Sequence, residues 1–176
     1  MDILVLNYEY PPLGGGAAPV CRDLAEGMAK EGHRITVVTM GFSGLPEYEM
    51  HDGMEIYRLN CLRQKEHSCM PWEQCSYILA AKRFLKLHLK THRYDACHTH
   101  FVIPTGQIAL WVKEKFDIPY IITAHGSDVE GHNDKLYYKR PSSDSQTGLE
   151  SNCQGSICGC GTVQLFAGSD EVPDAS

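Results

Sequence analysis

The sequence lacks an excess of positive charge, a long apolar run and an export signal. Its 176 residues carry 16 lysines and arginines against 22 aspartates and glutamates, which gives a formal net charge of −6. Binding to a nucleic-acid backbone requires a basic surface field, so we do not expect a nucleic-acid partner. No apolar stretch approaches the roughly 18 residues of a membrane-spanning helix, and no basic segment with a cleavage site precedes the first apolar run. These absences predict a soluble, cytoplasmic chain.

Paired cysteine motifs are also missing, although the chain contains eight cysteines. The last three form C-x4-C-x-C, which differs from the paired spacing of a structural zinc site. The other five are scattered without a C-x2-C pair: Cys21, Cys61, Cys69, Cys75 and Cys97. We therefore expect reduced thiols and no resident metal or cofactor.

Short apolar and β-branched runs alternate with segments of helical periodicity. The first run, 3–6, is apolar throughout, as in a parallel strand that is buried on both faces. The same patterns predict further strands at 35–39, 55–59, 94–98 and 119–123, and helices at 20–32, 72–92 and 104–116. This alternation of strands and helices predicts an α/β fold with a Rossmann-like, doubly wound parallel sheet.

The composition changes at about residue 139. Proline, serine, glycine and cysteine then replace the periodic apolar pattern, and only Ile157 and the stretch 163–166 offer apolar side chains for burial. We therefore predict two parts, a Rossmann-like domain over 1–138 and an atypical, disordered tail over 139–176.

Three consecutive glycines, Gly14, Gly15 and Gly16, stand between the first predicted strand and the first predicted helix. Glycine lets the backbone turn tightly and approach a ligand, and the N–H groups of a helix N-terminus favour an anion such as a diphosphate. A flexible turn without a ligand is the alternative. The dinucleotide fingerprint G-x-G-x-x-G is absent and the second strand ends without a carboxylate for a ribose, which disfavours a nicotinamide-dependent dehydrogenase.

Polar side chains also gather after the fourth and fifth predicted strands. His98 and His100 stand at i and i+2, so they point to the same side of a continuing strand, where they either line a polar cleft or hold a metal. The missing carboxylate with zinc-like spacing favours the cleft. His125, Ser127 and Asp128 follow the fifth strand, and a neutral imidazole beside a carboxylate suits the hydroxyls of a sugar. The alternative is that His125 and Asp128 cap the next segment.

Three segments together resemble a known family in their order and spacing: NYEYPPLGGGAAPVCRDLAEGMAKEGHRITVVT, YDACHTHFVIPTG and PYIITAHGSDVEGHN. They are similar to the N-terminal, acceptor-side domain of GT-B glycosyltransferases of family 4, over residues 1–133. The resemblance implies one Rossmann-like half of a GT-B fold. It also implies an enzyme of hexosyltransferase type, which moves a sugar from a nucleotide-sugar to an acceptor with retention of anomeric configuration and without a bound metal.

The same resemblance implies roles for individual residues. Gly15 and Gly16 would lie near the donor diphosphate, and His125 would contact the transferred sugar with Asp128 and His100 as neighbours. The implied partners are a nucleotide-sugar and a glycan or lipid-linked acceptor, which admits peripheral contact with a membrane. In the family, a C-terminal domain supplies the basic pair that grips the diphosphate and the E-x7-E signature. The resemblance does not extend to that domain, so we expect little or no activity from the isolated chain.

The tail departs from the family pattern, in which a helix and a strand follow. With freely chosen synonymous codons, a −1 reading frame from about residue 141 gives a family-like continuation, so we hypothesise a frameshift, which the coding DNA tests. Two alternatives stay open. One is a non-catalytic module that binds a glycan acceptor or pairs with a separate C-terminal donor domain. The other is an inactive, truncated gene product that folds poorly because apolar sheet surface stays exposed.

Overall fold

The structure, a computed structural model, describes residues 1–125 and the strand at 163–166. Its elements are β1 (Asp2–Leu6), α1 (Ala17–Lys30), β2 (Arg34–Met40), β3 (Tyr48–His51), β4 (Met54–Leu59), α2 (Pro71–His88), β5 (Ala96–His100), η1 (Val102–Gly106), α3 (Gln107–Phe116), β6 (Tyr120–Ala124) and β7 (Val163–Phe166). The segment η1 is a kinked helical turn that joins β5 to α3. The predicted division at residue 138 lies outside the described residues and stays a prediction.

The strands form one mostly parallel sheet in the order β3-β4-β2-β1-β5-β6-β7. The five inner strands, from β4 to β6 in this order, run parallel, whereas the edge strands β3 and β7 are antiparallel to their neighbours. From β1, the chain winds outwards first through α1 and β2 and later, on the other side, through β5 and β6. The predicted α/β fold with a Rossmann-like, doubly wound parallel sheet is confirmed.

The antiparallel hairpin of β3 and β4 does not follow from the apolar patterns. The residues of β3 are largely exposed, so no apolar run marks them. Its turn consists of Asp52 and Gly53, whose φ values are 48° and 78°. A two-residue hairpin turn requires such positive φ values, and aspartate-glycine is among the strongest signals for it.

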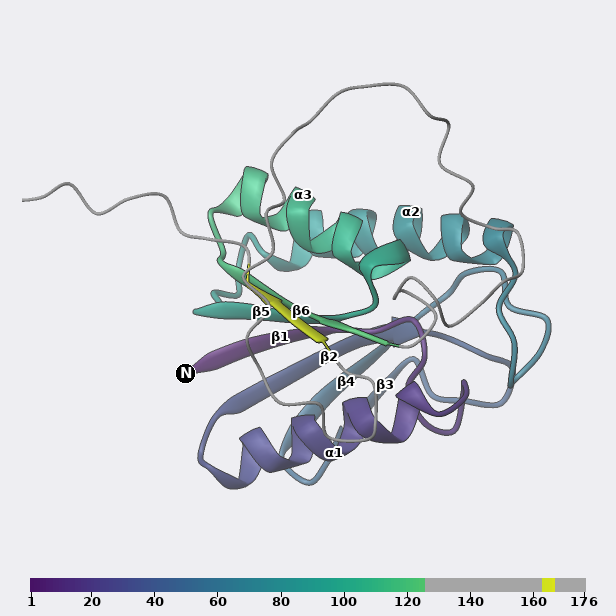
Figure 1. Ribbon diagram of the computed structural model, residues 1–176, viewed down its shortest axis with the longest axis horizontal. Helices are drawn as coiled ribbons and strands as arrows, with labels where there is room; N and C mark the ends of the chain where they lie inside the picture. The colour runs from purple at the N-terminus through teal and green to yellow at the C-terminus, as the bar shows by residue number, and fades with distance from the viewer. Residues whose placement is uncertain (126–162, 167–176) are drawn as a thin grey trace, which may run out of the picture.

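Helices cover both faces of the sheet, with α1 on one face and α2 and α3 on the other (Figure 1). Under α1, one cluster of buried side chains includes Val5, Cys21, Ala25, Ile35, Val37 and Ile56. A larger cluster under α2 and α3 includes Leu4, Leu6, Val38, Tyr77, Leu85 and Ile108. Alternate residues of β1 therefore enter both clusters, which explains why its sequence is a continuous apolar run.

Strand β5 begins two residues later than the sequence pattern predicts and continues to His100. Asp95 stands before it, where its carboxylate accepts the N–H of Asp2 at 2.7 Å and its own N–H donates to the Asp2 carbonyl oxygen at 2.8 Å. The resulting register pairs His98 with Val5 of β1. Because Val5 packs towards α1, His98 and His100 point to the α1 side of the sheet.

Helix α2 packs one face on the sheet and leaves the other exposed. Tyr77 is fully buried, and its hydroxyl donates to the carbonyl oxygen of Val38 in β2 at 2.7 Å. Leu85, two turns later, is also fully buried, whereas Leu87 is 65% exposed. Within the described residues, no helix is both long and apolar enough to cross a bilayer.

The contrast between Leu85 and Leu87 tests this packing. We expect Leu85→Ala to lower the free energy of unfolding by about 2–5 kcal/mol, because it deletes buried methyl groups and leaves a cavity. Leu87→Ala is the matched control on the same helix and should change this free energy by less than about 0.5 kcal/mol. Urea unfolding followed by circular dichroism measures both, and equal effects would contradict the orientation of α2.

Candidate functional site

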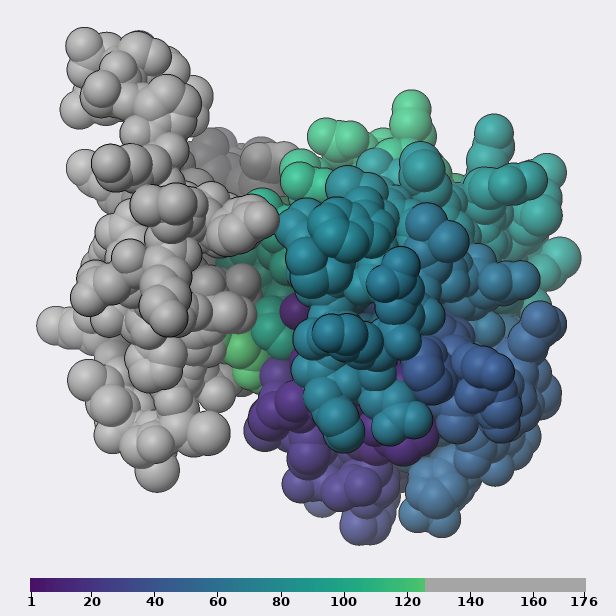
Figure 2. All heavy atoms as spheres, turned by 90° about the vertical axis from the view of Figure 1, so that its right-hand side faces the viewer, coloured from purple at the N-terminus to yellow at the C-terminus, as the bar shows by residue number. Residues whose placement is uncertain are grey.

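The carboxyl ends of β1, β5 and β6 lie side by side at one edge of the sheet. The chain leaves β1 towards β2 on one side, and β5 lies on the other side, so the strand order reverses between β1 and β5. Ligands of open α/β sheets bind at such a switch point. Figure 2 looks onto this edge, where the purple N-terminal segment and the teal segment before α2 lie together. The segment after β1, the turn after β5 and His125 after β6 form the candidate site.

The glycine loop follows β1 and leads directly into α1, as predicted. Gly14 has a φ of +97°, which residues with side chains rarely adopt, and its N–H donates to the carbonyl oxygen of Glu66 at 2.8 Å. Gly15 and Gly16 are exposed, and a Cβ added to either would meet no atom within 4 Å. The loop therefore requires glycine at position 14 and has open space beside the next two.

The carboxylate of Glu9 fills the inner side of the glycine loop. Its Oε2 accepts the N–H of Gly15 at 3.1 Å. Gly14 passes so close that an added Cβ would lie 2.5 Å from the Cβ of Glu9. The N–H groups of Gly14 and Gly15 are therefore both used within the protein. At the start of α1, the N–H of Ala18 donates to the carbonyl oxygen of Gly15 at 3.1 Å and Pro19 has no N–H. The N–H groups that the helix leaves without intrahelical partners are therefore those of Gly16 and Ala17.

The buried guanidinium of Arg63 connects the glycine loop to the segment between β4 and α2. It donates to the carbonyl oxygens of Tyr8, Lys65 and Glu66 at 3.3, 3.0 and 2.9 Å. It also lies 4.0 Å from the carboxylate of Glu9, which partly balances that charge. Sequence reasoning missed both residues: Glu9 is part of the YEYPP segment that carries the resemblance, whereas no motif marks Arg63.

Three histidines lie near the carboxyl ends of β5 and β6. His100 is fully buried, and its Nδ1 lies 3.0 Å from Nε2 of His125. His98 Nε2 lies 2.8 Å from the hydroxyl of Thr123, and the ring centres of His98 and His100 are 4.6 Å apart. The other ring nitrogen of His100, Nε2, is buried and has no hydrogen-bond partner in the part of the chain that the structure describes. Two predicted site residues, His100 and His125, are thus in direct contact.

Burial keeps these rings uncharged at neutral pH. Burial, together with the smaller effect of the neighbouring histidine rings, lowers the pKa of His98 to about 4 and that of His100 to about 3. Burial also lowers the pKa of His125. Each ring therefore carries one donor and one acceptor nitrogen, and no charge.

Phe101 connects the histidines to the loop after β1. Its ring centre lies 4.8 Å from that of Tyr8 and 4.6 Å from that of His125. Its φ of 73° with a ψ of 142° is rare for a residue with a side chain, and its carbonyl oxygen accepts the hydroxyl of Thr105 at 3.0 Å. Strained backbone of this kind persists only where the surroundings hold it. Sequence reasoning missed Phe101, because backbone strain leaves no signal in composition or spacing.

Several predicted roles are not tested by these observations. Ser127 and Asp128 lie outside the described residues, and the role of the three glycines in diphosphate binding stays a prediction. The five described cysteines are free thiols. Among the described residues, the side chains whose ligand atoms lie close enough to share a metal ion are Glu26, His51 and Asp52, on α1 and in the β3–β4 turn, and not the three histidines of the site.

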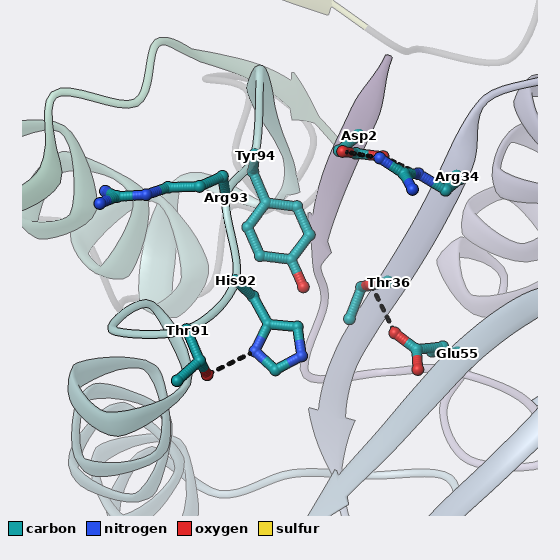
Figure 3. A pocket seen from close by; sticks show the side chains of 8 residues that line it. All are labelled: Asp2, Arg34, Thr36, Glu55, Thr91, His92, Arg93 and Tyr94. Atoms are coloured by element: carbon teal, nitrogen blue, oxygen red, sulfur yellow. Dashed lines mark hydrogen bonds and ion pairs between the residues drawn. The ribbon is translucent and has the colours of Figure 1, made fainter.

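A separate polar pocket of about 350 Å³ lies at the opposite edge of the sheet (Figure 3). Asp2 and Arg34 form an ion pair on its wall, and Glu55 accepts the hydroxyl of Thr36 at 3.3 Å. Glu47 and Glu55 have the E-x7-E spacing. Because Glu55 lies near the start of β4, far from the carboxyl edge, and bonds within the sheet, we interpret this spacing as coincidental.

A Rossmann-like sheet with a glycine loop and uncharged histidines at its switch point has the architecture of one GT-B glycosyltransferase domain. The model of the glycosyl transferase 4-like domain matches residues 15–146. The chain therefore belongs to this family, and the predicted glycosyltransferase membership is confirmed.

Relatives agree with this assignment. Uncharacterized glycosyltransferase MJ1607 of Methanocaldococcus jannaschii is 31% identical over 131 residues, covering 73% of this chain and 32% of that protein. Uncharacterized glycosyltransferase MJ1178 of the same organism is 26% identical over 128 residues, covering 73% and 33%. The chain thus spans about a third of the length of these relatives.

Solved structures support the fold. Sucrose-phosphate synthase from Thermosynechococcus elongatus superimposes with a TM-score of 0.60 at 17% identity, covering 71% of this chain and 33% of that one. At this identity the likeness concerns the architecture alone. It confirms the GT-B-like arrangement of the sheet and its helices.

The buried histidines make the stability of the fold depend on pH. A histidine in an unfolded chain has a pKa near ~6.5, whereas His98 and His100 have pKa values of about 4 and about 3 in the fold. Below about pH 6.5 the unfolded chain binds protons that the folded chain excludes. The contribution of the two uncharged rings to the free energy of unfolding is therefore complete above that pH and is lost as the pH falls towards their pKa values in the fold.

As the pH falls below about 6.5, we expect each of these two histidines to lower the free energy of unfolding by up to about 1.4 kcal/mol per pH unit. Urea unfolding between about pH 7 and pH 5 measures the slope. His100→Asn removes one titrating ring and should therefore remove the contribution of one histidine from the slope of the free energy of unfolding against pH. An unchanged slope in this variant would contradict the burial of an uncharged His100.

Proposed function

We propose that this chain is the acceptor-side half of a retaining glycosyltransferase of hexosyltransferase type. The donor would be a nucleotide-sugar and the acceptor a glycan or a lipid-linked saccharide. One observation carries the proposal: the glycine loop, the start of α1 and the uncharged pair of His100 and His125 lie on strand ends that are neighbours at one switch point. Membership of the glycosyl transferase 4-like family supports the transfer chemistry.

The glycine loop would act on the leaving diphosphate. The transition state of the transfer would resemble an oxocarbenium ion. The enzyme must therefore stabilise the leaving diphosphate and orient the acceptor hydroxyl. The N–H groups of Gly16 and Ala17 would bind the anion. Gly15 would add its N–H after releasing Glu9. Arg63, 4.0 Å from Glu9, limits the repulsion between that carboxylate and a diphosphate.

His125 would contact the transferred sugar, with Ser127 and Asp128 as further polar groups. An uncharged imidazole suits this role, because it binds a hydroxyl without adding charge next to the cationic sugar of the transition state. The basic pair and the glutamate signature that hold the donor would come from a second domain, as in the family. We therefore propose that the isolated chain transfers sugar slowly or not at all.

Joining this chain to the C-terminal part of a relative such as MJ1607 tests the proposal. We expect the joined protein to release nucleoside diphosphate from a UDP- or GDP-sugar in the presence of an acceptor, and the chain alone to release little. In the joined protein, His125→Ala should lower kcat/KM by about 10²–10³-fold, as for the loss of one donor to a transition state.

His51→Ala is the matched control, because His51 is exposed in the β3–β4 hairpin at the opposite edge. It should leave kcat/KM unchanged. Transfer by the chain alone at ordinary enzymatic rates would contradict the proposed need for a donor domain. Insensitivity of the joined protein to His125→Ala would contradict the proposed sugar contact.

The exposed face of α2 supports a lipid-linked acceptor. It combines basic and apolar side chains: Trp72, Leu79, Arg83, Lys86 and Leu87. The helix has one carboxylate, Glu73, which is buried. On a chain with a net charge of −6, this face has the opposite sign. Such a surface fits anionic lipid headgroups, with its apolar side chains at the acyl boundary. We propose it as the peripheral contact with a membrane that presents the acceptor.

Sedimentation with anionic and zwitterionic vesicles tests this contact. We expect binding to the anionic vesicles and a loss of at least about tenfold on Arg83→Glu with Lys86→Glu, since each basic residue near the surface contributes about 1 kcal/mol. Arg22→Glu with Lys30→Glu makes the same charge change on α1, on the other face of the sheet, and should have little effect. Equal losses in both variants would indicate a response to net charge alone.

Three alternatives differ from this proposal in their outcome. A split enzyme would show transfer when the chain is mixed with a separate donor domain without covalent joining. A non-catalytic module would bind a glycan acceptor but would leave the joined protein without transfer. An inactive gene product would fail to unfold cooperatively in the urea experiments.

A further inference from the structure

The contact between His100 and His125 requires one shared proton. Nδ1 of His100 and Nε2 of His125 lie 3.0 Å apart, which is hydrogen-bond distance. Burial lowers the pKa of both rings, so both are uncharged at neutral pH. Between two uncharged rings one nitrogen donates and the other accepts. The direction of this bond therefore fixes the tautomer of both histidines.

The surroundings of His100 decide the direction. If His125 donated from Nε2, His100 would accept at Nδ1 and would carry its own proton on Nε2. That nitrogen is buried and has no hydrogen-bond partner among the described residues. A buried N–H without an acceptor is rare in proteins, whereas an unused acceptor is tolerated more readily. Donation from Nδ1 of His100 avoids the buried, unpaired N–H.

Packing holds the two rings in this arrangement. The backbone of His100 pairs with Thr123 of β6, and its carbonyl oxygen accepts the hydroxyl of Thr105. The ring of Phe101 lies against the ring of His125, with centres 4.6 Å apart. His98 does not compete for the bond, because its Nε2 is paired with the hydroxyl of Thr123. Neither ring can turn without disturbing these contacts.

We propose that His100 is a positioning residue that holds His125 in its Nδ1–H tautomer. In this form Nε2 of His125 accepts from His100, and Nδ1 is the donor of the ring. In this tautomer Nε2 of His125 is not available as a general base towards a sugar. The role towards a sugar rests on the proposed function, whereas the tautomer is a property of the protein without ligand.

Long-range ¹H–¹⁵N correlation spectra of the full chain, labelled with ¹⁵N-histidine, distinguish the two tautomers directly. At neutral pH we expect both His100 and His125 to show the Nδ1–H pattern. Detection of His125 in the Nε2–H form would overturn the proposal. Single-histidine variants assign the signals.

Variants at position 100 separate positioning from packing. The amide of asparagine places an N–H near the position of Nδ1, so His100→Asn should keep His125 in the Nδ1–H form. His100→Leu removes the donor, so Nε2 of His125 is no longer held as an acceptor and this ring should gain the Nε2–H form. His98→Asn alters a neighbouring ring that does not bond to His125, and should leave His125 unchanged.

A changed tautomer in His100→Asn, or an unchanged one in folded His100→Leu, would overturn the proposal. If His100→Leu does not fold, the spectra of the unaltered chain and of His100→Asn still decide. In the joined enzyme, His100→Leu should lower kcat/KM by about tenfold and His100→Asn should restore it. Because the spectra contain no sugar, failure of the proposed transferase activity would leave the tautomer result intact, and the two failures are distinguishable.

Discussion

The pairing of β1 with β2 on one side and β5 on the other fixes the geometry of the whole domain. Both edges of β1 are hydrogen-bonded, and its side chains enter the apolar clusters on both faces. The pairing continues past the strand, because the N–H of Asn7 donates to the carbonyl oxygen of Val38 at 3.3 Å. The loop that carries Glu9 and the glycines therefore starts from a buried segment whose backbone is paired with its neighbours, next to the strand that ends in His100.

Elements with a strong local pattern could be predicted from the sequence, and elements that depend on distant partners could not. The continuous apolar run of β1 and the periodicity of α1 gave the correct elements, because burial on two faces and on one face leave different patterns. The start of β5 was misplaced by two residues, because Asp95 is held by Asp2, 93 positions away. The exposed strand β3 has no apolar pattern, although its Asp52-Gly53 turn has a signal.

The candidate site shows the same limit. Gly14 to Gly16, His100 and His125 were identified because they follow strands, and carboxyl ends of parallel strands meet at one edge. The contact between His100 and His125 depends on the register of β5 with β6, which the sequence alone does not fix. Arg63 comes from a segment without a motif, and its contacts with Tyr8 and Glu66 exist only in the folded chain. The carboxyl edge of this glycosyl transferase 4-like fold thus carries backbone N–H groups, uncharged histidine rings and the ion pair of Glu9 with Arg63.

The close approach of Gly14 to Glu9 has a consequence for sequence variation. The side chain of Glu9 occupies the space that a Cβ on residue 14 would need. A relative with a side chain at position 14 would need both a different backbone conformation and a smaller residue at position 9. The two positions should therefore change together in the family, so that an alignment would report this contact as a covarying pair even where neither residue meets a ligand.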